Sequence, residues 1–442
     1  MSGTARSRFP HRARRRQLTE TTTPRTGEDT LRVDDFNPLE PATVQCPYRW
    51  YQTLRDQAPV HFVASMGMWF VTSHELVTEA ALNHEVFSSA FGLPQMPPPE
   101  SVAEEIAAIQ AEGWEPVPTL LTADPPEHHY YRRMVAKAFT PRLIAEHEPA
   151  IRAIAAETVA AIPDGAPFEV VGGLAAPLPL RVIANVLNVS ADRTDDFKRW
   201  SDQFTASVGA VLDDAAAVQQ ARENLAFQKY FAAELDDRRA APRGDLLSGL
   251  VAAPSAESDD EPLSTAAALS VIQQLLIAGN ETTTKLLTGL LHKLTEEPDW
   301  WQWLREDPAG RSAAIVEEGL RFLAPVQSMF RITTTEAQLG ATTIPAGAMV
   351  VLTFGAANRD AAQFRGPEEF DPTRTDVKGH LSFSTGIHAC PGARLARLEA
   401  QIALEEMAGR FARLRFADDN DFAYEPSFML RGLHQLTLIC ES

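Results

Sequence analysis

The sequence predicts a mainly α-helical protein with a small β region, and three observations carry this prediction. Long stretches such as 141–162 and 215–237 repeat apolar residues with the helical period. Residues 332–354 instead alternate β-branched residues with glycine and proline turns, which is typical of short strands. No strand–helix–strand alternation and no GxGxxG sequence occurs, so a nucleotide-binding α/β domain is not expected.

The composition narrows the class of protein. Of the 442 residues, 45% are hydrophobic, an ordinary share for a globular chain with a large core, and the formal net charge is −19. This negative balance argues against nucleic acid and anionic membranes as partners. The cysteines, Cys46, Cys390 and Cys440, are too widely spaced for a disulfide framework or a CxxC metal site, as in a reducing cytoplasm.

Residues 1–34 are expected to be a disordered basic tail, followed by one domain over 35–442. The tail is rich in Arg, Ser and Thr, and polar residues rather than an apolar stretch follow its arginine cluster at 12–16, unlike in a signal peptide. No apolar segment of 18 residues occurs. We therefore expect a cytoplasmic monomer without a membrane anchor.

One cysteine stands out, because Cys390 lies in the segment FSTGIHACPG (383–392), directly before a helix-forming run. At the start of a helix, the dipole and the unpaired backbone N–H groups favour a thiolate over a thiol. A thiolate held in this way suits axial ligation of haem iron, where its electron donation favours O–O cleavage. A free structural cysteine before an ordinary helix is the alternative.

This segment resembles the haem-binding loop of the bacterial cytochrome P450 superfamily. The matching positions are Phe383, Ser384, Gly386, His388, Cys390, Pro391 and Gly392, and Ser384 replaces a commoner glycine. The resemblance implies a single-domain cytochrome P450 fold, with a long central helix over a haem. It also implies that Cys390 binds the iron of haem b, and that Phe383, Gly386, His388 and Gly392 contribute to the cofactor site. Because CxxCH is absent, the haem would be held without a covalent bond.

A long helix is predicted between Pro262 and Pro298, with Ser264 as its N-cap. Its apolar residues lie on several faces, so it should be buried. The sequence AGNETTT (278–284) in its middle places a glycine, a carboxylate and consecutive threonines where each is costly. A polar stripe that contacts solvent or a neighbouring loop is one explanation.

The family resemblance implies another explanation, an oxygen-binding groove beside a kinked and widened helix. Ala278 and Gly279 would make room for dioxygen, and Thr282 would hydrogen-bond to it. Glu281 would relay protons from solvent. Ordered proton supply needs an alcohol at the oxygen and an ionisable group behind it, which makes Thr282 and Glu281 the catalytic candidates.

Glu318 and Arg321 have the i,i+3 spacing of a helical ion pair, which by itself means little. The resemblance implies that they join Arg374 in a buried triad behind the haem loop, with a structural role. Glu317 is the rival for Glu318, because its spacing to Arg321 also suits a helix.

Haem propionates need cationic or hydrogen-bonding partners. The resemblance implies that His128, Arg132, Arg331 and His388 are these partners. The adjacent His129 and Arg133 are alternatives, and the helix phase relative to His128 favours Arg132 over Arg133.

Pro391 departs from the family pattern, which more often has an apolar residue with a backbone N–H here. An N–H that points at the thiolate withdraws charge from the sulfur, and proline has none. We therefore expect a more electron-rich sulfur and a lower iron reduction potential than in a Pro391→Leu variant. Proline in the first turn of the following helix is the structural interpretation, and the two are compatible.

The resemblance implies a monooxygenase that uses O2 and oxidises a hydrophobic small molecule. By family position, the loop at 91–114 and five residues should line the substrate site, namely Ile277, Ala278, Gln327, Met329 and Met429. The loop is long and Pro-rich, so it could close over the ligand.

The chain has no flavin or pyridine-nucleotide module and no iron–sulfur spacing, so NAD(P)H electrons should arrive through a separate ferredoxin and ferredoxin reductase. The basic residues Lys378, Arg394 and Arg397 could form the docking patch. A haem-thiolate sensor and a peroxide-driven enzyme are the alternatives. Glu281 and Thr282 favour the monooxygenase, because a sensor needs no proton relay.

Overall fold

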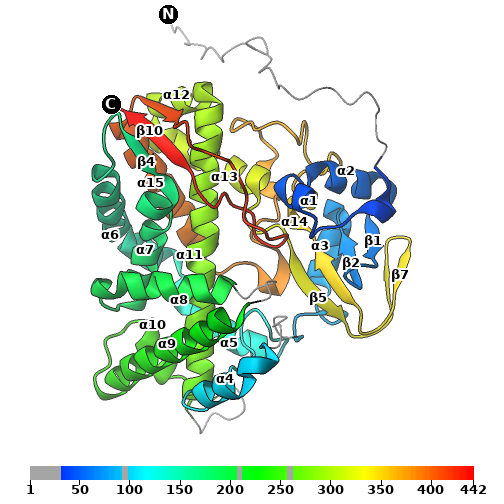
Figure 1. Cartoon of the computed structure of the whole chain (residues 1–442), viewed down its shortest axis with the longest axis vertical. Helices are drawn as coiled ribbons and strands as arrows, with labels where there is room; N and C mark the ends of the chain where they lie inside the picture. Colours follow the sequence, from blue (N-terminus) through cyan, green and yellow to red (C-terminus); the bar gives the residue numbers. More distant parts are fainter. Residues whose placement is uncertain (1–30, 92–97, 207–211, 256–261) are drawn as a thin grey trace, which may run out of the picture.

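A computed structural model describes residues 31–91, 98–206, 212–255 and 262–442 (Figure 1). The first 30 residues of the expected basic tail therefore lie outside the described residues. The α-helices are α1 (Pro41–Gln45), α2 (Tyr48–Gln57), α3 (His74–Leu82), α4 (Ala103–Gln110), α5 (Glu127–Ala138), α6 (Pro141–Ala160), α7 (Pro177–Leu187), α8 (Thr194–Ala206), α9 (Asp214–Ala240), α10 (Leu246–Val251), α11 (Thr265–Glu296), α12 (Pro298–Glu306), α13 (Pro308–Leu323), α14 (Phe354–Ala357) and α15 (Ala393–Arg410).

The strands form one five-stranded sheet, one three-stranded sheet and one hairpin among the described residues. They are β1 (Val60–Val63), β2 (Met68–Val71), β3 (Phe87–Ser88), β4 (Pro167–Glu169), β5 (Met329–Thr333), β6 (Ala337–Leu339), β7 (Thr342–Ile344), β8 (Met349–Leu352), β9 (Arg413–Phe416) and β10 (Thr437–Glu441). The prediction of a mainly helical protein with a small β region is confirmed.

The larger sheet has the order β1-β2-β8-β5-β3, so it joins residues 60–88 to residues 329–352. β2 and β8 run parallel, with Trp69 opposite Val350. The strands expected after Arg331 are confirmed as β5 to β8, but three of the five strands come from residues 60–88, where the sequence predicted none. These strands have four residues or fewer, too short for a clear alternation, and β2 and β3 owe their pairing to distant segments.

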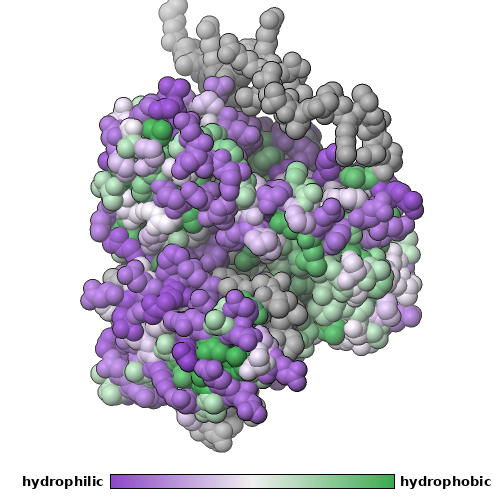
Figure 2. All heavy atoms as spheres, in the orientation of Figure 1, coloured by the Kyte–Doolittle hydropathy of each residue, from purple (hydrophilic) through white to green (hydrophobic). Residues whose placement is uncertain are grey.

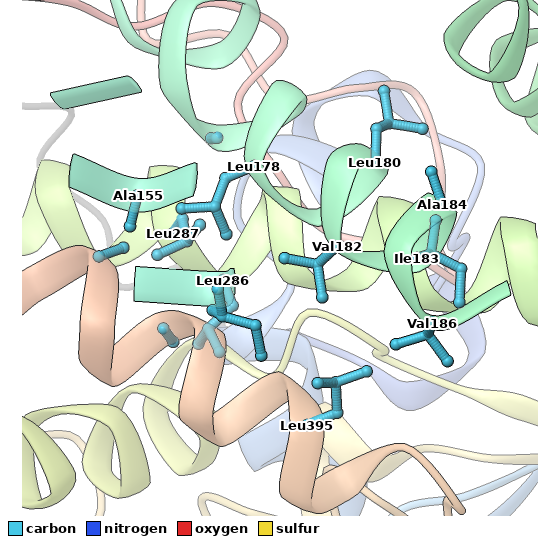
Figure 3. Packing of buried hydrophobic residues seen from close by; sticks show 14 of the residues in the cluster. Ala155, Leu178, Leu180, Val182, Ile183, Ala184, Val186, Leu286, Leu287 and Leu395 are labelled. Carbon is cyan, nitrogen blue, oxygen red and sulfur yellow. The ribbon is translucent and has the colours of Figure 1, made fainter. Parts of the chain in front are cut away.

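Most helices pack around α11 in one large apolar core. Figure 3 shows Leu286 and Leu287 of α11 among side chains of α7, such as Leu178 and Val182, with Leu395 of α15 beside them. All but Leu395 are 1% exposed or less. Burying such side chains contributes about 2 kcal/mol each to folding, and this core fixes α11 relative to α15.

The central helix α11 runs along the length of the molecule, between the helical part and the larger sheet (Figure 1). It begins as predicted, because the Ser264 hydroxyl accepts a hydrogen bond from the Ala267 backbone N–H at 3.2 Å. The helix is α-helical without a break from Thr265 to Glu296. The hydroxyls of Thr282 and Thr284 donate to the carbonyls of Ala278 and Ala175 without breaking the helix, and the expected kink and widening at 278–284 stay a prediction.

The surface carries many polar side chains over the helical part, whereas apolar side chains gather over the larger sheet (Figure 2). Phe62 of β1 is the clearest case, at 44% exposed, with its ring 5.2 Å from that of Trp69. Within the described ranges, no helix combines the length and the apolar character that a membrane span requires.

Candidate haem and oxygen site

The Cys390 loop lies directly before α15, whose N-cap is Gly392. The backbone N–H of Cys390 donates to the carbonyl of Phe383 at 2.8 Å, which closes the loop. Gly386 has a φ of +69°, and a Cβ there would lie 3.2 Å from the carbonyl oxygen of Ala81, so glycine suits this turn. Ser384 also has a positive φ, of 58°, at the position where the family pattern prefers glycine.

The surroundings of the Cys390 sulfur both oppose and favour a thiolate. The side chain is accessible on one side, but protein encloses it otherwise, and this burial raises the pKa of the thiol. The backbone N–H groups of Gly392 and Ala393 and the charges of Arg132 and Arg397 act in the opposite direction without cancelling it. The helix start alone therefore does not ionise Cys390. A metal cation at the sulfur would add the positive charge that stabilises the thiolate.

Pro391 lies just before the N-cap of α15 and not in its first turn, so the structural interpretation of this proline is wrong in detail. The helix begins at Ala393, two residues later. The N–H groups that favour the thiolate belong to Gly392 and Ala393, and Pro391 adds none.

His128 and His388 come together from α5 and from the Cys390 loop, with ring centroids 4.3 Å apart. Nδ1 of His128 and Nε2 of His388 are buried without a hydrogen-bond partner in the described structure. Burial, followed by the charge of Arg132, lowers the pKa of His128 to about 4. Burial, followed by the charge of Arg331, lowers the pKa of His388 to about 3. Both rings are therefore neutral at pH 7 in the described structure. An anion beside them would raise both pKa values and favour the protonated ring, in which both nitrogens donate.

Arg331 is a buried arginine without a carboxylate partner in the described ranges. Its side chain lies on β5 and donates to the carbonyl of Phe330 at 2.6 Å, and the residue is 4% exposed. Burial lowers the pKa of Arg331 to about 10, against the weaker opposing effect of Asp124. A buried guanidinium of this kind calls for an anion.

These side chains fit haem. Arg331, Arg132 and the two unpartnered histidine nitrogens provide cationic and donor groups beside Cys390, and propionate groups are the anions that they would hold. The neighbours His129 and Arg133 are both exposed, which leaves His128 and Arg132 as the inward pair of α5. No cluster of three or more His, Cys, Asp or Glu side chains that could hold a metal ion occurs in the described ranges.

Part of α11 is accessible although its neighbours are buried. The accessible positions recur every four residues as 273–274, 277–278 and 281–282, whereas Leu275, Leu276 and Asn280 between them are buried. This accessible stripe carries Ala278 and Thr282 on one face of the helix. The Thr282 hydroxyl donates to the carbonyl of Ala278 at 2.8 Å.

Glu281 lies on the same stripe, and it belongs to a chain of ion pairs that the sequence did not predict. Lys285 Nζ lies 2.8 Å from the Glu281 carboxylate and 2.7 Å from the carboxylate of Glu425. The Glu-to-Lys spacing of four residues could have indicated Lys285. Glu425 lies in an irregular segment far along the chain, and nothing in its local sequence indicates the contact.

The expected triad is present behind the loop. Arg321 donates to both carboxylate oxygens of Glu318, at 2.8 and 2.7 Å, and Arg374 lies 2.9 Å from the same carboxylate. Glu318 and Arg321 are completely buried. The rival Glu317 pairs instead with Arg397 and with His380, whose Nε2 lies 3.3 Å away. The i,i+3 pair is therefore the buried one.

The residues expected to bind substrate fall into two groups. Ile277, Met329 and Met429 are partly buried apolar side chains, and Ala278 is exposed on the accessible stripe. The side chain of Gln327 is used within the fold, because its amide donates to the carbonyl of Ala324 at 2.7 Å at the end of α13. Its Oε1 is buried without a hydrogen-bond partner in the described ranges, so a contact of Gln327 with substrate stays a prediction.

The end of the loop expected to close over the ligand, at Trp114, and the residues that follow it are anchored to helices. Trp114 exchanges two hydrogen bonds with the Gln228 side chain of α9, at 3.0 and 2.8 Å. The N–H groups of Val117 and Leu121 donate to Ser270 and Gln274 of α11, at 2.9 and 3.1 Å. The first half contains α4, which packs on α9. Residues 114–121 thus form a fixed wall. The Pro-rich residues 92–97 of the expected loop lie outside the described residues, so its closure over the ligand stays a prediction.

A large groove of about 970 Å³ lies elsewhere, between α5, α6, α7 and α10. It shares none of the expected cofactor, oxygen or substrate residues. The exposed cations Arg133 and Lys137 of α5 line it. The geometry of Cys390, Arg331 and Thr282, and not the size of this groove, identifies the candidate site.

Known proteins share this arrangement. A sequence profile described as Cytochrome P450 matches residues 312–431. The chain is 33% identical over 413 residues to cytochrome P450 107B1 of Saccharopolyspora erythraea, covering 92% of this chain and 98% of that protein. It is 37% identical over 399 residues to erythromycin C-12 hydroxylase of the same organism, covering 89% and 94%. The structure of cytochrome P450 CYP109Q5 from Chondromyces apiculatus matches with a TM-score of 0.81 at 35% identity, covering 93% of this chain and 99% of that one.

A helical fold with a single cysteine beside buried cationic and donor groups defines a haem-thiolate protein. With such identity over almost its whole length, the chain belongs to the cytochrome P450 family. It is a cytochrome P450 monooxygenase that uses haem iron and O2, and not a sensor, in line with its relatives that are named as hydroxylases.

Proposed function

We propose that this monooxygenase hydroxylates or otherwise oxidises a hydrophobic small organic molecule, with Cys390 as the iron ligand. Electrons from NAD(P)H would reach it through a separate ferredoxin and ferredoxin reductase. The observation that carries the assignment of the site is Arg331, a buried cation without a carboxylate partner in the described ranges, close to His388 of the Cys390 loop.

Haem would be held by residues from three elements. Arg132 and His128 of α5, Arg331 of β5 and His388 would hold the propionates, while Phe383, Gly386 and Gly392 shape the loop around Cys390. The bound haem would supply the reduction of dioxygen and the transfer of one oxygen atom to the substrate.

The accessible stripe of α11 would position dioxygen and protons. Ala278 and Gly279 leave space, since the nearest side-chain atom to a Cβ built on Gly279 is 3.8 Å away. The Thr282 hydroxyl would release the Ala278 carbonyl in order to donate to dioxygen, and Glu281 behind it would relay protons from solvent.

The iron ligand can be tested by spectroscopy. The reduced, carbon-monoxide-bound protein should show the long-wavelength Soret band of thiolate ligation, and Cys390→Ser should lose it. Cys440→Ser, at a buried cysteine of β10, is the matched control and should keep the band. A histidine-type spectrum of the unmodified protein would overturn the assignment.

The substrate would contact apolar side chains, including Ile277, Met329 and Met429, together with Phe91 and Phe428. The relatives named as hydroxylases of erythromycin and 6-deoxyerythronolide B support a large hydrophobic molecule. A screen of macrolides, steroids, terpenoids and fatty acids by the low-to-high-spin absorbance change would identify the class, and Met429→Ala should weaken the binding of the best compound.

The ferredoxin would dock on exposed cations near the Cys390 loop. Lys378 and Arg394 are exposed, and no ion pair of theirs occurs within the described part of the chain, whereas Arg397 is partly neutralised by Glu317. Charge reversal at Arg394 should raise the KM for a surrogate ferredoxin without changing substrate affinity, and high salt should have the same effect. An unchanged KM would remove this surface from the proposal.

Residues 35–442 would form the single catalytic domain, with the basic tail dispensable for catalysis. Val33 packs near buried Phe36 in the core beside α2, so the last residues of the expected tail belong to the folded part. A variant that lacks residues 1–30 should retain its haem and its substrate affinity.

A further inference from the structure

Gln274 is a polar side chain on the accessible stripe of α11. It lies one turn before Ala278 and two turns before Thr282, on the same face of the helix. Leu275 and Leu276, which follow it, are 7% exposed or less, so its accessibility is a property of this face and not of the whole segment.

The orientation of its amide follows from its partner. The backbone N–H of Leu121 can only donate, and it lies 3.1 Å from Oε1 of Gln274. The amide oxygen must therefore face Leu121, which leaves Nε2 with two N–H groups on the other side. Within the described ranges, no acceptor lies within hydrogen-bond distance of Nε2.

The amide is held in place rather than free to turn. Leu121 belongs to the anchored wall at 114–121, which Ser270 also fixes, by accepting the N–H of Val117 at 2.9 Å. The preceding residue, Leu120, makes a backbone hydrogen bond with His388 of the Cys390 loop. Residues 120–121 thus link the Gln274 amide to His388 of the Cys390 loop, and Gln274 itself lies one helical turn before Ala278.

We propose that Nε2 of Gln274 donates a hydrogen bond to a carbonyl or hydroxyl oxygen of the substrate and so sets its orientation over Ala278. This inference rests on the proposed function and narrows the substrate class to hydrophobic molecules with an oxygen acceptor near the oxidised carbon. A ligand without such an oxygen would displace water from Nε2 and leave this donor without a hydrogen bond. The cost of an unpaired donor lets the site discriminate between otherwise similar molecules.

Binding of matched ketone and hydrocarbon probes tests the proposal. The dissociation constants of 2-adamantanone and adamantane, and of a steroid ketone and its parent hydrocarbon, would be measured by the spin-state absorbance change. The unmodified protein should bind at least one ketone about tenfold more tightly than its hydrocarbon, a difference of about 1.4 kcal/mol. Gln274→Leu should abolish this preference.

Two further variants separate donation from anchoring. Gln274→Glu keeps an acceptor for Leu121 but replaces the donor by oxygen, so it should also lose the preference. Gln273→Leu removes an amide from the adjacent position and should keep it. A preference lost in Gln274→Leu but retained in Gln274→Glu would show that the residue only anchors the wall, and would overturn the inference.

The inference about Gln274 would also be overturned if all variants preferred the ketone over the hydrocarbon equally. The same holds if the unmodified protein showed no such preference. The spectrum of the reduced, carbon-monoxide-bound protein distinguishes these failures from failure of the proposed function. If the thiolate band is present and the preference is absent, only the assignment of Gln274 fails. If the band is absent from the unmodified protein, the proposed function and the assignment fail together.

Discussion

Glu281 and Lys285 form an ion pair with 2.8 Å between Oε2 and Nζ, although only 3% of the Lys285 side chain is exposed. Burial lowers the pKa of Lys285, but the carboxylates of Glu281 and Glu425 raise it by more, so the ammonium group is charged at neutral pH. Lys285 therefore connects the carboxylate that we propose as a proton relay to the more exposed Glu425.

Lys285→Met should destabilise the protein by about 3 kcal/mol, because it leaves a carboxylate partly buried without its cation. Urea unfolding would measure this loss of stability. A double-mutant cycle with Glu281→Gln should show that much of the loss is interaction energy between the two side chains. Lys293→Met is the control on the same helix, because both partners of Lys293 are more exposed, and it should cost clearly less. Equal costs would contradict the prediction.

Thr282→Ala should leave NAD(P)H oxidation in place but divert it to hydrogen peroxide, because the hydroxyl that guides proton delivery is gone. The measurement is the ratio of peroxide to oxidised substrate in a system with surrogate ferredoxin. Thr295→Ala is the matched control, since Thr295 also donates to the carbonyl four residues earlier, at 2.7 Å, outside the accessible stripe. Unchanged coupling in Thr282→Ala would remove Thr282 from the mechanism.

Arg331→Leu should weaken the retention of haem without destabilising the haem-free chain. The arginine is buried and its pKa is lowered to about 10, so its charge destabilises the haem-free fold and becomes favourable only when an anion binds beside it. Haem transfer to apomyoglobin should be faster, by about tenfold, for a loss of about 1.4 kcal/mol. Arg359→Leu, which removes an arginine paired to Glu368 at 2.7 Å, should instead destabilise both forms.

Pro391→Leu should raise the reduction potential of the iron, because it adds a backbone N–H next to the Gly392 and Ala393 groups that already favour the thiolate. Pro391→Ala should share the shift, since it adds the same N–H without the bulk. Spectroelectrochemical titration measures the potential. An unchanged or lower value in both variants would count against the role of the missing N–H.

The stability of the protein should fall in acid partly through Glu317. Burial raises the pKa of Glu317, but the hydrogen bonds and charges of His380 and Arg397 outweigh it and lower the pKa to about 2, from an ordinary value of 4.5. A depressed carboxyl pKa stabilises the fold fully above the ordinary value and loses this effect as the pH falls towards the folded value. The contribution is at most about 3 kcal/mol.

The free-energy difference between the unmodified protein and Glu317→Gln should therefore stay constant from pH 7 to about pH 5, and shrink below about pH 4.5. Glu306→Gln, at an exposed carboxylate, is the control and should show little difference at any pH. A difference that grows on acidification would contradict the assignment.

The sequence predicted those parts of the site that follow from the family motif or from the spacing of residues along a helix. The Cys390 loop, the boundaries of α11 and the pair Glu318–Arg321 are local in sequence, so spacing was sufficient to place them. Neither the pairing of Lys285 with Glu425 nor the hydrogen bond from Leu121 to Gln274 could be inferred, because each joins segments far apart in the chain.

Gln327 makes a further contact that the sequence did not indicate. Its position in the family pattern predicts a contact with substrate, and its amide also donates to the carbonyl of Ala324 at the end of α13. The local sequence of a polar residue does not show whether its side chain will hydrogen-bond to the free carbonyls at a nearby helix end. The strands at 60–88 were missed for a related physical reason, because a strand of four residues takes most of its stability from partners elsewhere.

The parallel pairing of β2 with β8 joins segments separated by most of the chain. Closing such a long loop has an entropic cost before the pairing can offset it, so this contact should form late in folding and slowly. Because Arg331 lies on β5, which pairs directly with β8, the cationic side of the haem pocket would be completed only at that stage. A nascent or truncated chain would then be unable to capture the cofactor before its C-terminal third has been synthesised and docked.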